Sequence, residues 1–328
     1  MWAHQLLVQA GRALCLLKHR NSAIEARLQL QLGEQDIQAL QVACARGGMR
    51  LGAYYHWYLQ KLVVANRLRQ LDGPSVQRMI ASMDATDYSR FDEVCETPGG
   101  LLVAVPHHGH YILSIIALAE RLRGKREVFV FYGDPATHVG NDLFDQLHGH
   151  VWGNSPWVHV IHDNRAGLVR ALKALQQGAV VVIMPDVYKD EHDTLVIPFC
   201  GRQLNVLLGT AALARKTGAA ILPLVSRARS GLRFAGAFGT PLLPSASAAP
   251  ACPAEATLHA DYQTTLSLFR QFETLMDPCM IHWQYVRNHY ARQAAFPDIP
   301  RDELGQVTEL FFSDPRINVD PTNAIHLQ

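Results

Sequence analysis

The feature that most constrains the fold of this 328-residue chain is an alternation of two sequence patterns that begins at Gly99. Short apolar runs rich in β-branched residues alternate from there with segments of helical pattern. Strands of a parallel sheet have this continuous apolar character, because helices cover both faces of such a sheet. We therefore expect an α/β fold with a largely parallel, mixed sheet flanked by helices. The predicted strands are GLLVAVP, REVFVFYG, VHVIHD, AVVVIMPD, TLVIPF and AAILPLVSRAR.

The rest of the chain is predicted from weaker signals. Good helix formers dominate residues 1–97, which predicts a helical N-terminal region packed on a core at 98–300, with an irregular tail at 301–328. Within the core, YILSIIALAERLRG, RAGLVRALKALQQG and NVLLGTAALARKTG predict helices, and Gly178 and Gly218 are suited to end the last two. The stretch LLPSASAAPACPAEATL predicts a loop, and a further helix is expected from about Tyr262 to Met276.

Composition excludes some classes of function. The formal net charge is +1 and no basic stripe interleaves with aromatic residues, so nucleic acid is not a predicted partner. Six scattered cysteines without a C-x-x-C pair predict free thiols in a reducing cytoplasm. No segment approaches the roughly 20 apolar residues that span a bilayer. Residues 1–20 predict an amphipathic helix packed on its own domain, and peripheral contact with the inner face of the membrane is the alternative.

Three histidines follow the first predicted strand within the stretch VPHHGHYIL, namely His107, His108 and His110. In parallel α/β sheets, ligands bind beyond the carboxyl ends of the strands. Asp186 follows another predicted strand, and Asp163 and Arg165 follow a third. Three polar clusters can thus converge on one cleft. For the third cluster the alternative is structural, because Asp163 or Asn164 could cap the helix predicted at 165–177.

Metal binding is a second interpretation of the histidines, since eight of the sixteen lie between residues 107 and 162. Zinc requires three or four ligands that converge with fixed geometry. Neither H-x-H pair has a companion spacing such as H-E-x-x-H. We therefore predict no metal ligands and no cofactor, and a metal-dependent hydrolase is ranked last among the functions considered.

The order of these motifs resembles the late acyltransferases of lipid A biosynthesis, within the lysophospholipid acyltransferase superfamily. The first block of that family is typically written H-F-G-N-W-E. Anchored on Gly109, HHGHYI places His107 on the catalytic histidine and Ile112 on the catalytic acid. Arg165 and Asp186 match an arginine and an aspartate of the next block. The resemblance runs from about residue 25 to residue 292, and its further matches are Phe199, Gly201, Thr210, Leu213, Ala214, Arg215, Gly218, Ala219, Pro223, Pro278, Gln284, Tyr285 and Arg287.

The resemblance implies an acyltransferase that moves an acyl group from a carrier-protein or coenzyme A thioester to a hydroxyl or amine acceptor. His107 would be the general base, and Arg165 and Asp186 would complete the catalytic set. Arg165 could stabilise an oxyanion or hold a phosphate of the donor; its structural alternative is an ion pair with Asp186 or Asp163. His108, His110, Tyr111 and Asp163 are expected to bind substrate, although surface positions in a loop are the alternative for His108 and His110.

The family pattern is broken in two places. Members of the family normally carry an N-terminal membrane anchor, and here at most a short amphipathic helix is expected in that place. The acceptor is therefore expected to be a soluble or carrier-bound intermediate of a specialised pathway.

The second departure is Ile112, which replaces the acid that would orient the imidazole. A backbone carbonyl, His108, His110, or a carboxylate from another strand end could replace it, with Asp186 and Asp163 as candidates. The second function considered is therefore a non-catalytic acyl- or carrier-binding homologue, which Ile112 favours.

Overall fold

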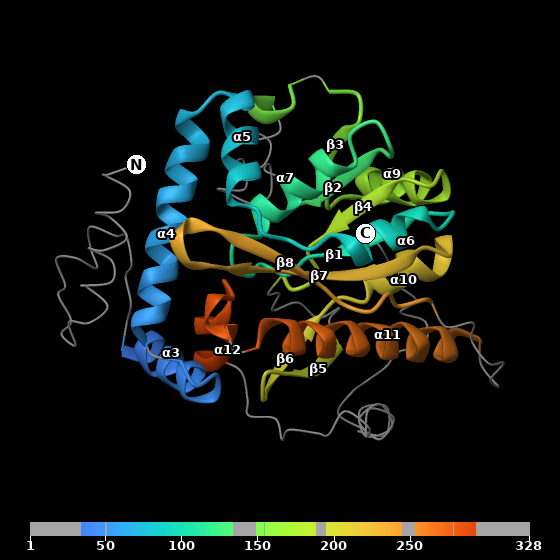
Figure 1. Cartoon of the computed structure of the whole chain (residues 1–328). Coiled ribbons are helices and arrows are strands. Elements are labelled where there is room, and N and C mark those ends of the chain that lie inside the picture. Colours follow the sequence, from blue (N-terminus) through green and yellow to red (C-terminus); the bar gives the residue numbers. More distant parts are fainter. Residues whose placement is uncertain are drawn as a thin grey trace.

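The computed structural model describes residues 34–49, 51–133, 149–153, 155–187, 195–244, 253–277 and 279–292. Its centre is a six-stranded sheet in the order β3-β2-β4-β1-β7-β8, flanked by helices (Figure 1). Neighbouring strands are parallel except for β7 and β8, so the predicted α/β fold with a largely parallel sheet is confirmed. The strands are β1 Leu101–Ala104, β2 Val128–Tyr132, β3 Val158–His162, β4 Val180–Ile183, β7 Ala220–Ala228 and β8 Phe234–Phe238.

Burial on both faces explains the apolar composition of the central strands. In β1, Leu102 and Ala104 face one hydrophobic core, whereas Leu101 and Val103 face the other, as the alternation of side chains along a strand requires. All four residues of β1 and all four of β4 are buried. Because neither face meets water, no polar residue interrupts these runs.

Two sets of helices cover the two faces of the sheet. The helices α5 (Gly73–Met83), α6 (Ser89–Glu96) and α7 (Tyr111–Arg121) bury side chains in the core that contains Val103. Several elements outside the central sheet bury side chains in the other core. Among them are α3 (Glu34–Arg46), β5 (Leu195–Phe199), β6 (Arg202–Val206), α9 (Arg165–Gln176), α10 (Gly209–Thr217), α11 (Pro253–Met276) and α12 (Val286–Arg292).

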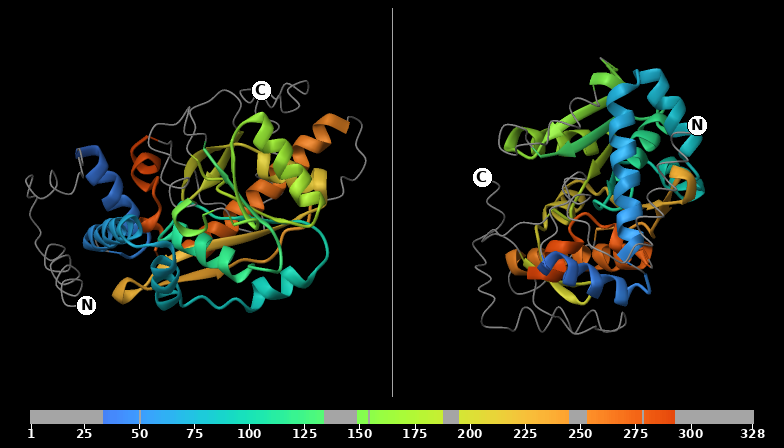
Figure 2. Two further views of the ribbon diagram at one scale, coloured as in Figure 1. Left: turned by 90° about the horizontal axis from the view of Figure 1, so that it is seen from above. Right: turned by 90° about the vertical axis from the view of Figure 1, so that its left-hand side faces the viewer.

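The long helix α4 (Leu51–Gln70) contributes to both cores. Tyr54 and Trp57 belong to one core, and Val64 and Leu68 to the other. Figure 2 shows how α4 runs the height of the molecule from α3 to α5. This helix of the N-terminal part of the chain therefore packs against both cores.

Three elements differ from the sequence-based expectation. Arg202–Val206 is strand β6, which pairs with β5 in an antiparallel hairpin. Its last two residues, Asn205 and Val206, were predicted as the start of a helix, but α10 begins only at Gly209. Cys200 and Gly201 both have positive φ, which is the conformation of a two-residue hairpin turn. Helix α11 begins at Pro253 rather than near Tyr262, because Pro is favoured in a first turn. Strand β8 was not predicted.

The signals for the ends of helices are confirmed where the structure describes them. Asn164 caps α9, with its side-chain oxygen accepting a hydrogen bond from the Gly167 N–H at 2.9 Å. Gly178 and Gly218 follow α9 and α10 with φ of 83° and 72°. These conformations are accessible to glycine at little cost.

Some predictions fall on other parts of the chain. The N-terminal amphipathic helix, the tail after residue 300, Pro278, Cys15 and Cys252 lie outside the described residues. The four described cysteines, Cys44, Cys95, Cys200 and Cys279, are free thiols. Within the described ranges, no helix combines the length and the apolar character that crossing a membrane requires.

Candidate active site

The loop that carries His107 connects the end of β1 to the start of α7 and is packed on β7. Gly109, the centre of this loop, has φ of +60°, and a Cβ on it would lie 2.2 Å from the Ser226 carbonyl oxygen. Its N–H donates to the His282 carbonyl oxygen at 3.0 Å. Only glycine combines this backbone conformation with so close an approach, so the motif glycine fixes where the histidines point.

Asp186 is the carboxylate that holds His107. Its Oδ1 lies 2.8 Å from His107 Nδ1, and its Oδ2 accepts the His107 backbone N–H at 2.7 Å. β4 pairs with β1, so the residue that follows β4 lies beside the residue that follows β1. Asp186 is 1% exposed, and a buried carboxylate that accepts charge-assisted hydrogen bonds is a fixed, acceptor-only partner. With the Nδ1 proton donated to Asp186, the free lone pair of the imidazole is on Nε2.

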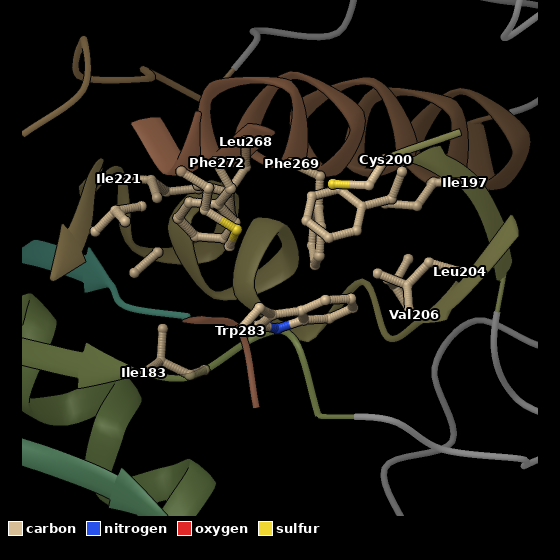
Figure 3. Packing of buried hydrophobic residues seen from close by; sticks show 14 of the residues in the cluster. Ile183, Ile197, Cys200, Leu204, Val206, Ile221, Leu268, Phe269, Phe272 and Trp283 are labelled. Atoms are coloured by element: carbon tan, nitrogen blue, oxygen red, sulfur yellow. The ribbon is translucent and has the colours of Figure 1, made fainter. Parts of the chain in front are cut away.

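A third donor to Asp186 comes from Trp283, whose Nε1–H donates to Oδ2 at 2.8 Å. Trp283 follows the short 3₁₀ helix η2 (Met280–His282) and is fully buried. Its indole lies among side chains of α11 and of the β5–β6 hairpin (Figure 3), and Phe199 meets it edge-on with ring centroids 5.1 Å apart. The hairpin and α11 thus position the indole, and the indole positions the carboxylate.

Two tyrosines flank the His107 ring. The Tyr111 centroid lies 4.8 Å from it and the Tyr285 centroid 5.3 Å from it, both edge-to-face. Burial, with Asp186 nearby, raises the pKa of both phenols, so both are neutral donors at neutral pH. The His107 side chain keeps 9% of its surface exposed, and in the described part of the chain no group bonds Nε2.

Both ring nitrogens of His108 lie beside backbone carbonyl groups. The residue is 0% exposed, with Nδ1 2.8 Å from the Ser226 carbonyl oxygen and Nε2 2.8 Å from that of Cys279. The surface-loop alternative is therefore wrong for His108, and its substrate-binding role stays a prediction. The ring ties the catalytic loop to β7 and to the segment before η2.

His110 is also buried, at 4% exposure, so the surface-loop alternative is wrong for it as well. Burial, together with the nearby Lys61 and His108, lowers its pKa to about 4, which makes it neutral at physiological pH. Its Nε2 is buried, and the structure shows no partner for it among the described residues.

Asp163 and Arg165 do not join this cluster. Both are exposed, at the end of β3, and β2 and β4 lie between β3 and β1. Three strand spacings separate β3 from β1 by ~14 Å. The predicted alternative of an ion pair between Arg165 and Asp186 is wrong, since the Asp186 oxygens are occupied by His107 and Trp283.

Ile112, at the position of the expected acid, lies in the first turn of α7. Its side chain is half-buried and packs against the core that contains Val103. The carboxylate absent from this turn is supplied by Asp186 from the neighbouring strand end.

A comparison with family models decides the family. The model for bacterial lipid A biosynthesis acyltransferases matches residues 68–246, more than half of the 328 residues. The chain belongs to this family. As a member of the lipid A biosynthesis acyltransferases it falls in a class whose reaction is acyl transfer. His107, Arg165 and Asp186 lie in the matched range, whereas α3, most of α4, Trp283 and Tyr285 lie outside it. The comparison with curated proteins finds no match.

Sequence reasoning missed the role of Trp283 in this lipid A acyltransferase family member. Trp283 stands directly before Gln284 and Tyr285, two of the residues that carry the family resemblance. A tryptophan needs a partner for its N–H when it is buried, so its place beside these residues was the available signal. Within the described ranges, no three His, Cys, Asp or Glu side chains are placed to share a metal ion.

Proposed function

We propose that this protein transfers an acyl group from the thioester of a carrier protein or of coenzyme A to a hydroxyl or amine acceptor, with His107 as the general base. The observation that carries the proposal is the hydrogen bond of His107 Nδ1 to Asp186, which leaves Nε2 as the open, basic nitrogen. This is the arrangement in which a carboxylate fixes the tautomer of a catalytic histidine and stabilises its protonated form.

The reaction conserves protons. Nε2 takes the proton of the acceptor O–H or N–H while the acceptor atom attacks the thioester carbonyl carbon. When the tetrahedral intermediate collapses, the carbon–sulfur bond breaks and the imidazolium returns its proton to the departing thiolate. The products are an ester or amide and a thiol, and Asp186 stays ionised throughout.

The negative oxygen of the intermediate needs a donor, and the hydroxyls of Tyr111 and Tyr285 are suited to that role. Both rings touch the His107 ring, and both phenols are neutral at neutral pH for the reason given above. Preorganised donors at the developing oxyanion commonly contribute ~10²–10³-fold in kcat.

Arg165 is better placed for a remote group of the donor than for the oxyanion. A thioester of pantetheine carries its phosphate at the far end of a long arm. A guanidinium on the strand end ~14 Å from β1 is suited to bind that phosphate. Arg165→Ala should therefore raise the KM for the donor and change kcat little.

The non-catalytic alternative loses its principal support, because Ile112 no longer means that the base lacks a carboxylate. The deciding experiment is intact-mass detection of acyl transfer, with acyl-carrier and acyl-coenzyme A donors and mixed hydroxyl and amine acceptors. We expect turnover in the wild type and a loss of at least about a hundredfold in His107→Ala. His259→Ala, on α11, is the matched control and should retain activity. Donor binding without turnover, unchanged in His107→Ala, would establish the non-catalytic function instead.

A further inference from the structure

Lys61, on α4, is a half-buried cation without an ion-pair partner among the described residues. Its Nζ donates to Gln284 Oε1 at 3.0 Å and lies 5.7 Å from the centroid of the Trp57 ring. Both partners are neutral. The other charge that acts on Lys61 is that of Arg287, which is also positive, and the described part of the chain places no carboxylate against the ammonium.

Arg287 has an acidic partner of its own. Asp36 Oδ2 lies 3.5 Å from Arg287 Nη1. Burial and Arg287 together lower the Lys61 pKa to about 8. Taking an ammonium out of water without pairing it is costly, so an uncompensated lysine of this kind indicates a site that a ligand completes.

The surroundings of Lys61 are rich in unpartnered nitrogen atoms. Trp57 Nε1, Gln60 Nε2 and His110 Nε2 are buried, with no hydrogen-bond partner among the described residues. Trp57 and Gln60 are one helical turn apart on the same helix as Lys61, and His110 lies close enough for the lysine charge to lower its pKa. These groups are suited to an oxygen-rich, negatively charged partner.

Lys61 is joined to the candidate active site through one residue. Gln284, which accepts from Lys61, donates its backbone N–H to the His107 carbonyl oxygen at 2.9 Å. Gln284 itself is exposed, so the position beside the ammonium is open to solvent. Helix α4, which carries Lys61, lies at the left of the molecule in Figure 1, and α9 lies at the right.

We propose that Lys61 anchors a subsite for an anionic group, a carboxylate or a phosphate, carried by a substrate that reacts at His107. The subsite is defined by Lys61 with Gln284, Trp57 and His110 around it. It rests on the proposed function for the identity of the reacting centre, but its occupation by an anion requires no turnover. The anion can belong to the acceptor or to the donor, and coenzyme A distinguishes these sources.

The test is anion binding to the full chain at constant ionic strength, with acetate and inorganic phosphate as probes. We expect one of them to raise the Tm of the wild type by a few degrees at saturation. Lys61→Met should weaken this binding roughly ten- to hundredfold, the loss of one charge-assisted hydrogen bond. Lys61→Arg should retain it. Lys216→Met, an exposed lysine in the last turn of α10, is the matched control.

The ligand-free proteins give a second readout. Holding an unpaired ammonium away from water destabilises the folded state. Without an anion, Lys61→Met should therefore be as stable as the wild type or more stable. If Lys61→Met unfolds, Lys61→Gln is used in its place. Acetate affinity should also fall as the pH rises through about 8 in the wild type but not in Lys61→Arg, because the lysine then loses its proton. His110 stays neutral there, because burial lowers its pKa to about 4.

The outcomes separate the two proposals. A Lys61-dependent shift with coenzyme A assigns the anion to the donor; a Lys61-dependent shift with acetate or phosphate but not with coenzyme A assigns it to the acceptor. Equal shifts in wild type and Lys61→Met, or no shift in the wild type with either probe, would overturn the subsite. Lys61-dependent binding without any acyl transfer would leave the subsite standing and overturn the proposed function.

Discussion

At the residue scale, Asp186 meets His107 twice, through the imidazole and through the backbone N–H, while Trp283 occupies the same carboxylate. Asp186→Asn keeps the shape of the side chain but removes its charge and offers an N–H where an acceptor is needed. We expect kcat to fall ~10²–10⁴-fold with little change in the KM of either substrate. Steady-state kinetics measure this, and circular dichroism establishes that the variant is folded.

Trp283→Phe provides the graded comparison for that measurement. The phenyl ring preserves most of the packing against Phe199, while one of the three donors to Asp186 is lost. A reduction in kcat of roughly tenfold is expected, the effect of one hydrogen bond to a charged group. An effect as large as that of Asp186→Asn would mean that packing, rather than the hydrogen bond, is what Trp283 contributes.

Gly109 is the residue at which the backbone is most sensitive to substitution. Gly109→Ala combines a positive φ with a contact of 2.2 Å to the Ser226 carbonyl oxygen, so the loop must move. We expect a loss of about 2–4 kcal/mol in the free energy of unfolding and loss of activity. Gly124→Ala is the matched control, because Gly124 has φ of +73° and nothing within 4 Å of the added Cβ. It should cost only about 1 kcal/mol in urea unfolding.

Much of the site could be predicted at this scale, and the rest depended on information that a sequence does not carry. His107 and Asp186 were identified because polar residues at the ends of buried strands gather at one edge of a parallel sheet. Asp163 satisfied the same rule equally well. Only the strand order places β4 beside β1 and β3 three spacings away, and no local pattern encodes that order. Trp283 comes from a distant segment that reaches Asp186 only in the folded chain.

At the element scale, an ion pair fastens α10 to α11. Arg215 donates to both oxygens of Asp261, at 2.8 Å each, and the Asp261 side chain is 3% exposed. Arg215 lies in the most family-like run of the sequence, and its structural role is to join two helices behind the sheet.

Arg215→Met should be strongly destabilising, because it leaves a buried carboxylate without its partner. We expect about 2–4 kcal/mol less free energy of unfolding in urea. The double variant Arg215→Met with Asp261→Leu should recover part of this loss, since no charge is then stranded. Asp92→Asn breaks an exposed pair with Arg121 between α6 and α7, and should cost less than about 1 kcal/mol. Equal losses in the two single variants would contradict this distinction.

The elements that the sequence did not predict share a cause. The run from Asn205 to Gly218 was predicted as one helix, and its first residues are apolar enough for one. The two-residue turn at Cys200 and Gly201 divides it from β5 and makes Arg202–Val206 a strand. Gly201 at the second position of such a turn was the available signal. Helix α11 was shortened in prediction because Pro253 and the small residues near it have the composition of a loop.

At the scale of the whole molecule, buried neutral histidines make stability depend on pH. Burial lowers the pKa of both His110 and His289 to about 4, against an ordinary value of 6.5. Between these values the unfolded chain binds more protons than the folded one, so stability is lost as the pH falls through 6.5 towards 4. Each histidine contributes on the order of 3 kcal/mol to that loss.

Urea unfolding at several pH values between 7.5 and 5 measures this effect. His289→Asn should reduce the slope of unfolding free energy against pH by about one proton, or ~1.4 kcal/mol per pH unit, in the acid half of the range. His289 lies outside the catalytic loop: its Nε2 bonds the Phe199 carbonyl oxygen, and its ring packs edge-on against Trp283. A slope identical to that of the wild type would mean that His289 keeps an ordinary pKa in the folded state.

The carboxylate of this site stands at the end of a neighbouring strand, not one helical turn after the histidine, and this affects how members of the family are sorted. A search that requires histidine and acid within one short contiguous pattern tests a single loop. It would class this chain as a degenerate copy because of Ile112, although the fold presents a carboxylate to the imidazole from β4. Whether such a chain retains a general base has to be judged across neighbouring strands, and interrupted motifs elsewhere in the family call for the same inspection.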